Sequence, residues 1–382
     1  MRNISSRLKV LFIPGWYPSF GAENDVIGTF CREHARAAAL YDDVAVLAST
    51  RSLLRWFPLE WKKVMDRGVH TFYTYCGGSG LPRIAWPFWH LSLRHAIKRV
   101  MRDWGMPDLI HTQDEFSYHV IRAAKNIGVP FVMSQHASVF GQRQLSPMML
   151  MQYRYAFRYV KRVLATNPWG ERDYDYYGMK AQVTWLPNAV DTSIFYPPLD
   201  GVREAWLLHA SHFAPVKRFP DILKAFREVY KIRPDAILQI AGNGVNRLSM
   251  EQLARELLPE KSYHFHGMIS KMALADLMRR SRGFVLPSEF ETFGCVLIEA
   301  LACDCPVLTT RVGGIPATVP EGNGLFVEVG NVPQIVEGML RLLDGTHGIE
   351  MCRVSRETRE RFSQEAIGKV LHQIHIEATL RE

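Results

Sequence analysis

The chain has 382 residues, of which 47% are apolar and 22% are charged, and its formal net charge is +8. These values are typical of a soluble globular protein with two or three domains, and they exclude extensive disorder. No run approaches the roughly 18 consecutive apolar residues that a membrane-spanning helix requires.

The basic N-terminus leads into a short apolar run at residues 10–13, which stops at Pro14-Gly15. Because the hydrophobic region of a signal peptide is longer, we interpret this run as a first buried strand and expect a cytoplasmic protein. The six cysteines fit that compartment, since none forms the C-x-x-C pair of zinc ribbons and thioredoxin-type sites. We interpret Cys303 and Cys305, in an apolar run, as small buried residues.

Strands and helices alternate along the first half of the sequence. We predict strands at 8–13, 43–47, 109–111, 130–134 and 162–165, and helices at 28–40 and 117–127. Strands separated by helices in this way indicate a parallel sheet with helices on both faces.

The segment 51–104 interrupts this pattern and carries most of the net charge. It holds ten Lys or Arg residues against three acids, a net +7, and five of the nine tryptophans. The tryptophans are Trp56, Trp61, Trp86, Trp89 and Trp104. A basic, aromatic segment suits an anionic lipid surface, and the alternative is a solvated helix whose tryptophans pack inward. A nucleic-acid partner is not expected.

A linker at 195–201, rich in Pro, Asp and Gly, precedes a second series of alternating elements. Strands are predicted at 205–210, 236–241, 263–266, 283–286 and 306–309, and helices at 219–231, 248–258, 271–280, 296–302 and 363–380. The predicted class is α/β, with two doubly wound, Rossmann-like domains at 1–199 and 200–362 that face a central cleft. Open parallel sheets bind ligands at the carboxyl ends of their strands. We expect the C-terminal helix, about 363–382, to pack back on the first domain.

The segment 287–300, P-S-E-F-E-T-F-G-C-V-L-I-E-A, follows an apolar strand and leads into a helix. Phe293, Gly294 and Cys295 are expected to form the loop and first helical turn, whose free amides suit a phosphate or a polarised hydroxyl. Glu291 precedes that turn, and Glu299 follows eight residues later within an apolar run. The two carboxylates are placed to hold two polyols. The alternative, a capping acid and a solvated surface charge, fits Glu299 poorly.

This segment resembles the signature of the retaining family 4 glycosyltransferases with the GT-B fold, including its E-x(7)-E spacing. Further matching segments are P-N-A-V-D at 187–191, V-K-R-F at 216–219, A-G-N-G at 241–244 and G-G-I-P at 313–316. The segments P-G-W-Y-P at 14–18 and G-T-F-x-x-E at 28–33 resemble members that build bacterial surface polysaccharides. The likeness runs from about residue 8 to 330 and is densest over 187–317.

The resemblance implies that the first domain binds the acceptor and the second binds a nucleotide-sugar donor. Glu291 would contact the hydroxyls of the donor sugar, and Glu299 would hold the ribose. Lys217 would bind the diphosphate and stabilise the leaving group, because negative charge develops there in the transition state. The amides after Phe293 would assist.

Other donor-site roles also follow from the resemblance. Gly28 would approach the phosphates without a side chain in the way, and His136 would face the sugar. The base would meet the loops near Gly244 and Met268. The family requires no catalytic metal or cofactor.

The sequence departs from the family pattern at two positions. His212 stands where the family usually has an arginine, five residues before Lys217. Either Arg218 or a protonated His212 is a candidate replacement, and the latter predicts activity that depends on pH near 6–7. Ala317 replaces an acid expected after the 313–316 segment, and we assign it no role.

The remaining histidines have simpler interpretations. His111, after a buried strand, either lines the cleft or is a hydrogen-bonded core residue. His264 and His266 alternate on one short strand without a third metal ligand at a suitable spacing.

Two other short segments are also left without a catalytic role. Residues 77–80 (G-G-S-G) form a flexible loop, since no Lys-Ser/Thr follows for a phosphate loop. The acid pair Asp114-Glu115 either touches the acceptor or caps the helix at Ser117.

The sequence therefore predicts a retaining, metal-independent hexosyltransferase in polysaccharide biosynthesis. Its acceptor is expected to be a lipid-linked or cell-surface glycan, with the enzyme docked on the inner membrane face through 51–104. Two alternatives remain open: a transferase with a small soluble acceptor, and a nucleotide-sugar binding protein without catalysis.

Overall fold

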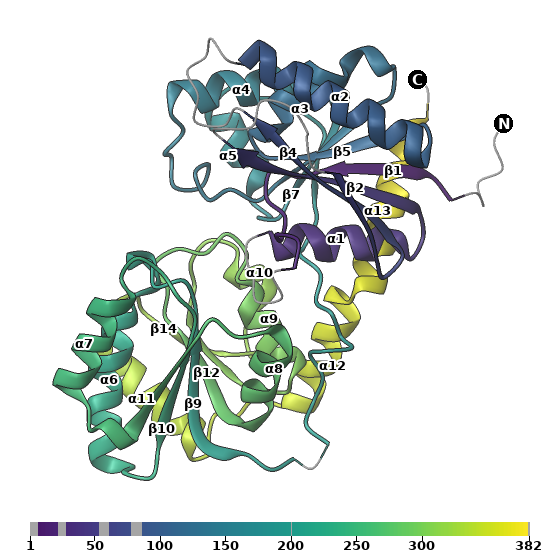
Figure 1. Ribbon diagram of the computed structural model, residues 1–382. Coiled ribbons are helices and arrows are strands. Elements are labelled where there is room, and N and C mark those ends of the chain that lie inside the picture. Colours follow the sequence, from purple (N-terminus) through teal and green to yellow (C-terminus); the bar gives the residue numbers. More distant parts are fainter. Residues whose placement is uncertain (1–6, 22–27, 53–60, 78–85, 200, 381–382) are drawn as a thin grey trace. The chain divides into compact units, whose positions relative to one another are not determined.

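The computed structural model describes residues 7–21, 28–52, 61–77, 86–199 and 201–380 (Figure 1). The chain forms two compact units, one of residues 1–189 with 364–382 and one of residues 190–363. Residues 190–199 therefore group with the second unit, and the C-terminal helix groups with the first.

The first unit is built on an eight-stranded sheet in the order β3-β4-β2-β1-β5-β6-β7-β8. Its strands are β1 (Lys9–Ile13), β2 (Asp43–Ser52), β3 (Trp61–Asp66), β4 (Val69–Gly77), β5 (Leu109–Gln113), β6 (Phe131–Gln135), β7 (Val160–Ala165) and β8 (Val183–Trp185). All neighbours are parallel except β3 and β4. The strand order reverses direction between β1 and β5, which is the point where such sheets bind ligands.

Helices cover both faces of this sheet. They are α1 (Thr29–Ala39), α2 (Trp86–Trp104), α3 (Phe116–Ala124), α4 (Pro147–Phe157), α5 (Gly170–Tyr176) and α13 (Gln364–Thr379). Strand β1 shows why: Leu11 and Ile13 join one buried cluster, and Val10 and Phe12 join another. Alternate side chains of a strand point to opposite faces, so both faces must be covered. Helix α13, yellow in Figure 1, packs against α1.

The second unit has a six-stranded parallel sheet in the order β11-β10-β9-β12-β13-β14. Its strands are β9 (Glu204–Ala210), β10 (Ile237–Ala241), β11 (Tyr263–Gly267), β12 (Ser281–Leu286), β13 (Val307–Thr310) and β14 (Leu325–Val327). Its helices are α6 (Phe219–Ile232), α7 (Arg247–Leu257), α8 (Lys271–Arg280), α9 (Cys295–Ala302), α10 (Ile315–Thr318), α11 (Val332–Leu343) and α12 (Met351–Phe362). The predicted α/β class with two doubly wound sheets is confirmed.

The segment 51–104 contains two strands and a helix, β3, β4 and α2, that the sequence analysis did not assign. Trp89 is buried, Trp61 donates to Asp103, Trp104 donates to Asp43, and the ring of Trp86 contacts Tyr118. These four tryptophans therefore pack inward, and Trp56 lies outside the described residues. Within the described ranges, no helix combines the length and the apolar character needed to cross a bilayer.

Candidate functional site

The loops after β9 and β12 meet at the point where the strand order of the second sheet reverses. The backbone N–H of Glu289 donates to the carbonyl of Val216 at 2.8 Å. Because β9 and β12 are parallel neighbours, their carboxyl ends deliver both loops to the same edge. This edge collects most of the residues that the sequence analysis assigned to the donor.

Lys217 and Glu291 form an ion pair across these two loops. The Lys217 Nζ lies 2.6 Å from Glu291 Oε1, and the hydroxyl of Ser288 donates to the same oxygen at 2.9 Å. Glu291 is 8% exposed, so its carboxylate is held in one place by an ammonium group and a hydroxyl. Ser288 was part of the recognised motif but had been given no role.

Two glycines of the 313–316 segment allow the loop that carries Glu291 to pack closely. Gly313 has a φ of 51°, and a Cβ there would lie 1.8 Å from the carbonyl oxygen of Glu291. A Cβ on Gly314 would lie 2.1 Å from the carbonyl oxygen of Thr292. The Gly314 N–H also donates to Glu291 O at 3.0 Å. Neither position has space for a side chain, so the two glycines allow the backbone of the Glu291 loop to lie in direct contact with the 313–314 backbone.

The predicted helix start after this loop is also present. Gly294 has a φ of 81° and precedes Cys295, the first residue of α9. Since glycine has no side chain, Gly294 supplies no side-chain cap to the first amides of the helix. Phe293 is buried, and its carbonyl accepts a hydrogen bond from Thr318 Oγ1 at 3.1 Å. The turn is therefore held from both sides and can present its amides to an anion.

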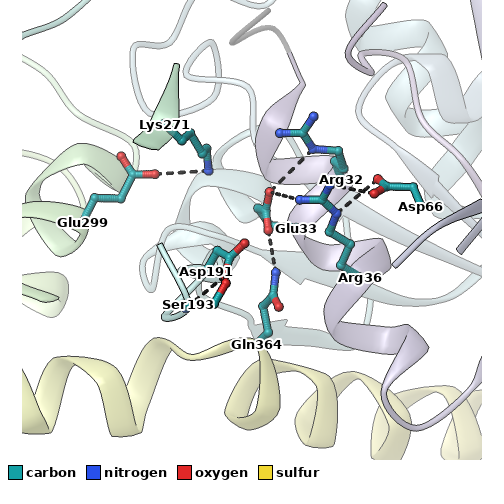
Figure 2. A network of polar contacts seen from close by, with 9 residues as sticks. All are labelled: Arg32, Glu33, Arg36, Asp66, Asp191, Ser193, Lys271, Glu299 and Gln364. Atoms are coloured by element: carbon teal, nitrogen blue, oxygen red, sulfur yellow. Dashed lines mark hydrogen bonds and ion pairs between the residues drawn. The ribbon is translucent and has the colours of Figure 1, made fainter. Parts of the chain in front are cut away.

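Glu299 lies on α9 and is 9% exposed. Its Oε1 is 3.3 Å from the Nζ of Lys271, the first residue of α8 (Figure 2). The interpretation as a solvated surface charge is therefore wrong. Lys271 was missed by the sequence analysis, because nothing in its local sequence separates it from a surface lysine at a helix start.

The two candidate replacements for the family arginine, Arg218 and His212, differ in their surroundings: Arg218 is paired with carboxylates, and His212 is exposed. Arg218 has a φ of 52°, and its Nε donates to Asp221 Oδ2 at 2.6 Å. It also lies 3.8 Å from Glu289, so carboxylates already surround its guanidinium. His212 is exposed, and its Nδ1 lies 3.2 Å from the carbonyl of Asn243.

The loops that the resemblance assigns to the base also lie at this edge. A Cβ on Gly244 would lie 3.0 Å from the backbone nitrogen of Phe213, so this glycine lets the loops after β9 and β10 approach each other. Met268 follows β11 and is half-buried. His209, which the sequence analysis did not single out, lies 2.8 Å from both Val285 O and Ser211 Oγ. Burial lowers its pKa to about 4, so it is a neutral support for the start of the β9 loop.

In the first unit, His136 begins the loop after β6. Its backbone N–H donates to Asp114 Oδ1 at 2.8 Å, and the N–H of Ala137 donates to the same oxygen at 3.1 Å. Asp114 has a φ of 46° and is buried. Burial, helped by the nearby Glu115, raises its pKa to about 7. The side chain of Asp114 thus holds the His136 loop and does not cap α3.

The ring of His136 lies beside Phe30, with a centroid distance of 4.4 Å, and near His34. Within the described residues, neither ring nitrogen has a hydrogen-bond partner, and both are shielded from solvent. Desolvation, with a smaller effect of His34, holds the pKa of His136 well below its usual range. The ring is therefore neutral near pH 7, with one donor and one acceptor nitrogen.

Gly28 precedes α1, and Glu33 lies within it. Gly28 has a φ of 70°, and a Cβ there would lie 2.5 Å from the backbone of Trp16. Glu33 is 1% exposed; its carboxylate accepts from Arg36 at 3.2 Å and from Gln364 at 2.6 Å (Figure 2). Glu33 therefore ties α1 to the first residue of α13.

The remaining histidines follow the simpler interpretations. His111 is buried, with Nε2 2.8 Å from Ser134 Oγ and Nδ1 3.2 Å from His375 Nε2, so it is a hydrogen-bonded core residue. His264 and His266 are ring neighbours, and His266 bonds to Gln239. In the part of the chain that the structure describes, no group of three or more His, Cys, Asp or Glu side chains could hold a metal ion. Of the loop 77–80, residues 78–80 lie outside the described residues.

Comparison with known proteins identifies relatives for both units. A family model described as "Glycosyltransferase Family 4" matches residues 28–194, and one described as "Glycosyl transferases group 1" matches residues 201–369. N-acetyl-alpha-D-glucosaminyl L-malate synthase of Bacillus anthracis is 37% identical over 141 residues, 37% of this chain and 36% of that protein. A GDP-mannose-dependent phosphatidylinositol monomannoside mannosyltransferase of Corynebacterium glutamicum is 34% identical over 178 residues, 42% of this chain and 46% of that protein. The chain thus spans less than half the length of these two relatives.

Solved structures share the whole fold at low sequence identity. Sucrose-phosphate synthase from Thermosynechococcus elongatus superposes with a TM-score of 0.79 at 21% identity, over 97% of this chain and 99% of that one. The Anabaena protein HepE, in complex with UDP and glucose, superposes with a TM-score of 0.75 at 16% identity, over 97% and 100% of the two chains.

Proposed function

Since the chain belongs to the family 4 glycosyltransferases with the GT-B fold, we propose that it transfers a sugar from a nucleoside diphosphate sugar to an acceptor, with retention at the anomeric carbon. The observation that carries this proposal is the part-buried Lys217–Glu291 pair at the edge of the second sheet. It sets a fixed cation beside a fixed carboxylate. That is the arrangement needed where a diphosphate leaves a sugar.

The proposed chemistry follows from the charge that develops as the bond to the leaving group breaks. The Lys217 ammonium faces the diphosphate and stabilises its growing negative charge, together with the first amides of α9. Glu291 accepts hydrogen bonds from the sugar hydroxyls. As the bond between the anomeric carbon and the diphosphate oxygen breaks, the acceptor oxygen bonds to that carbon from the same face and passes its proton to the leaving phosphate, so the configuration is retained. Because Lys217 supplies the positive charge, we propose that turnover needs no metal ion.

The second carboxylate serves the nucleotide. Glu299 can accept hydrogen bonds from both ribose hydroxyls. The ammonium group of Lys271, which lies beside Glu299 Oε1, offsets the negative charge of the carboxylate. His136 offers its neutral ring to the transferred sugar. Arg218 is held by Asp221, so Lys217 is the cation that we assign to the diphosphate.

The proposed acceptor is a lipid-linked or cell-surface glycan precursor. The mannosyltransferase relative is named for a phosphatidylinositol mannoside. The name of the N-acetyl-alpha-D-glucosaminyl L-malate synthase relative contains a small molecule, L-malate. This name supports the alternative, a transferase with a small soluble acceptor. A binding protein without catalysis is a third candidate, and it predicts that bound donor is not turned over.

Thermal unfolding against a panel of UDP-, GDP-, ADP- and CMP-sugars tests the donor site. A ligand that binds only the folded state raises the apparent stability by RT ln(1 + [L]/Kd). We expect a shift with one nucleotide class that is lost in Lys217→Ala and Glu299→Ala and is kept in Lys224→Ala, an exposed lysine on α6. No shift with any donor would contradict the proposal. Slow donor hydrolysis that disappears in Glu291→Gln separates an enzyme from a binding protein.

An exposed stripe on α2 supports docking on a membrane. Phe88, Leu91, His95, Lys98 and Arg102 are exposed and follow one another at helical spacing. Lys63 and Met65 are exposed on β3, on the same face of the strand as Trp61, which contacts α2. Apolar side chains beside cations suit an interface of anionic headgroups. We propose that this face holds the enzyme on the inner surface of the cytoplasmic membrane.

Sedimentation with vesicles that contain anionic lipid tests this docking. The variant Lys63→Gln/Lys98→Gln/Arg102→Gln should stay in solution, whereas Lys180→Gln/Lys224→Gln/Lys261→Gln, with the same change in charge, should sediment like the original protein. Arg99 is left unchanged because its guanidinium lies 4.4 Å above the ring of Trp61. Equal sedimentation of the two variants would refute a specific membrane face.

A further inference from the structure

Two exposed aromatic rings flank α5, the helix that follows β7 in the first unit. Trp169 is 49% exposed and Tyr176 is 66% exposed. Seven residues bring a helix back to nearly the same face, so the two rings lie on one stripe, about 10 Å apart along the axis. Exposed Trp and Tyr rings present flat apolar faces on which a ligand can stack, with a polar group at the ring edge.

A polar network braces the stripe between the rings. Asp173 lies on the same helical face, and its carboxylate is 3.0 Å from Arg143 Nη2 and 3.4 Å from the Asn167 amide. The Arg143 guanidinium in turn lies 4.2 Å from the centroid of the Tyr176 ring. The side-chain oxygen of Asn167 accepts from the backbone N–H of Trp169 at 3.0 Å. The Tyr176 ring is thus linked through Arg143 to the buried carboxylate of Asp173, and Asn167 links that carboxylate to the backbone of Trp169.

The stripe lies at the ligand-binding edge of the first sheet. Thr166, directly after β7, donates both its N–H and its hydroxyl to the carbonyl of Gln135, at 3.3 and 3.1 Å. His136 is the next residue, so the loop that leads to Trp169 runs beside the loop that carries the neutral histidine.

The charge of helix α5 disfavours an anionic partner. Helix α5 carries three acids, Glu171, Asp173 and Asp175, against one base, Arg172, which is a net −2. Adding Arg143 gives −1. An anionic membrane or a nucleic acid requires a positive surface. A neutral glycan suits this site, because its C–H faces stack on aromatic rings and its hydroxyls bond to carboxylate and guanidinium groups.

We propose that Trp169 and Tyr176 form a glycan platform that binds two successive sugar rings of the acceptor, with the Arg143 guanidinium, held by Asp173, donating to the hydroxyls between them. This assignment rests on the proposed function, since it places the acceptor of the same transfer reaction. It names neutral oligosaccharide as the substrate class.

Saturation-transfer NMR with the full chain tests the platform. The probes are maltotriose, α-1,6-mannobiose, cellotriose and N,N′-diacetylchitobiose at millimolar concentration. At least one should receive saturation in its ring protons and bind about tenfold more weakly to Trp169→Ala and Tyr176→Ala. Trp169→Phe should retain part of the binding. Tyr159→Ala is the matched control: Tyr159 is 42% exposed but precedes β7, at the opposite edge of the sheet.

Each outcome supports or overturns the platform. Saturation of none of the four probes, or binding unchanged in both alanine variants, would overturn it. Circular dichroism and thermal unfolding identify a variant that has lost its fold, and Trp169→Phe then decides. Donor-induced stabilisation and hydrolysis should be unchanged in the control Tyr159→Ala. If Lys217→Ala keeps full donor turnover, the proposed function fails, whatever the sugar probes show.

Discussion

The carboxyl edges of the two sheets differ in the charge of the side chains that they hold. In the second unit, Lys217 and Lys271 each hold a carboxylate in an ion pair. In the first unit, burial keeps His136 neutral and raises the pKa of Asp114 to about 7. Charged, paired groups suit an anionic diphosphate sugar, and neutral groups suit an uncharged sugar and acceptor. In each sheet the reversal of the strand order sets where the edge site lies, and the side chains set which charge it suits.

The largest expected effect is on the charged edge. Lys217→Ala should lower donor turnover by about 10²–10³-fold, the usual cost of removing one group that stabilises a developing oxyanion. Initial rates of nucleoside diphosphate release measure this. Lys224→Ala should stay within about twofold of the original rate. A loss of less than about threefold in Lys217→Ala would show that another cation serves the leaving group.

The second prediction concerns the backbone that supports the charged edge. Gly313→Ala places a Cβ 1.8 Å from Glu291 O, so the loop must move. Gly345→Ala is the control, since Gly345 has a φ of 70° and open space around its Cβ position. We expect the control to lower the free energy of unfolding by about 1–2 kcal/mol and Gly313→Ala to cost about 3 kcal/mol or more, with lost turnover. Denaturant unfolding compares the two variants. Equal costs would show that the close packing of the Glu291 loop does not constrain it.

At the edge of the first sheet, the raised pKa of Asp114 should make the free energy of unfolding depend on pH. A buried carboxyl whose folded pKa is about 7, above its unfolded value of about 3.9, stabilises the fold fully below pH 4. That contribution is lost as the pH rises to about 7. Relative to Asp114→Asn, the original protein should lose about 2–4 kcal/mol of unfolding free energy between pH 4 and 8.

Asparagine is a suitable substitute for Asp114. The backbone N–H groups of His136 and Ala137 both donate to Asp114 Oδ1, and the side-chain oxygen of asparagine can accept the same two bonds. The groups that face Asp114 are Glu115, Tyr153, Tyr174 and Cys31, and they are the same in both proteins. Denaturant unfolding at several pH values gives the difference. A difference that does not change with pH would mean that Asp114 is ionised throughout.

The smallest expected effect is at the second ion pair. Lys271→Ala should weaken nucleotide affinity by about 3–10-fold, because it leaves Glu299 in place and removes only its partly exposed partner. Isothermal titration with the nucleotide identified in the donor panel measures this. Glu299→Ala should cost more than Lys271→Ala, and the reverse order would assign the nucleotide contact to the lysine.

Local sequence determined much of this molecule. The alternation of apolar runs and helical periods predicts both parallel sheets, since a strand buried on both faces has few other interpretations. The spacing of Glu291 and Glu299 around Gly294 places a helix start between two carboxylates. Strand 43–47 extends to Ser52, and helices α11 and α12 were not predicted, because their amphipathic patterns carry no motif.

Tertiary structure decided what these groups contact. Lys271 is 28 residues from Glu299 and Ser134 is 23 from His111, so no local pattern could pair them. The pairing follows from the strand order, which brings the ends of neighbouring parallel strands to one edge. Burial is decided at the same level: the sequence shows a histidine at 136 and an acid at 114, but only packing removes the water that would set their ordinary pKa values.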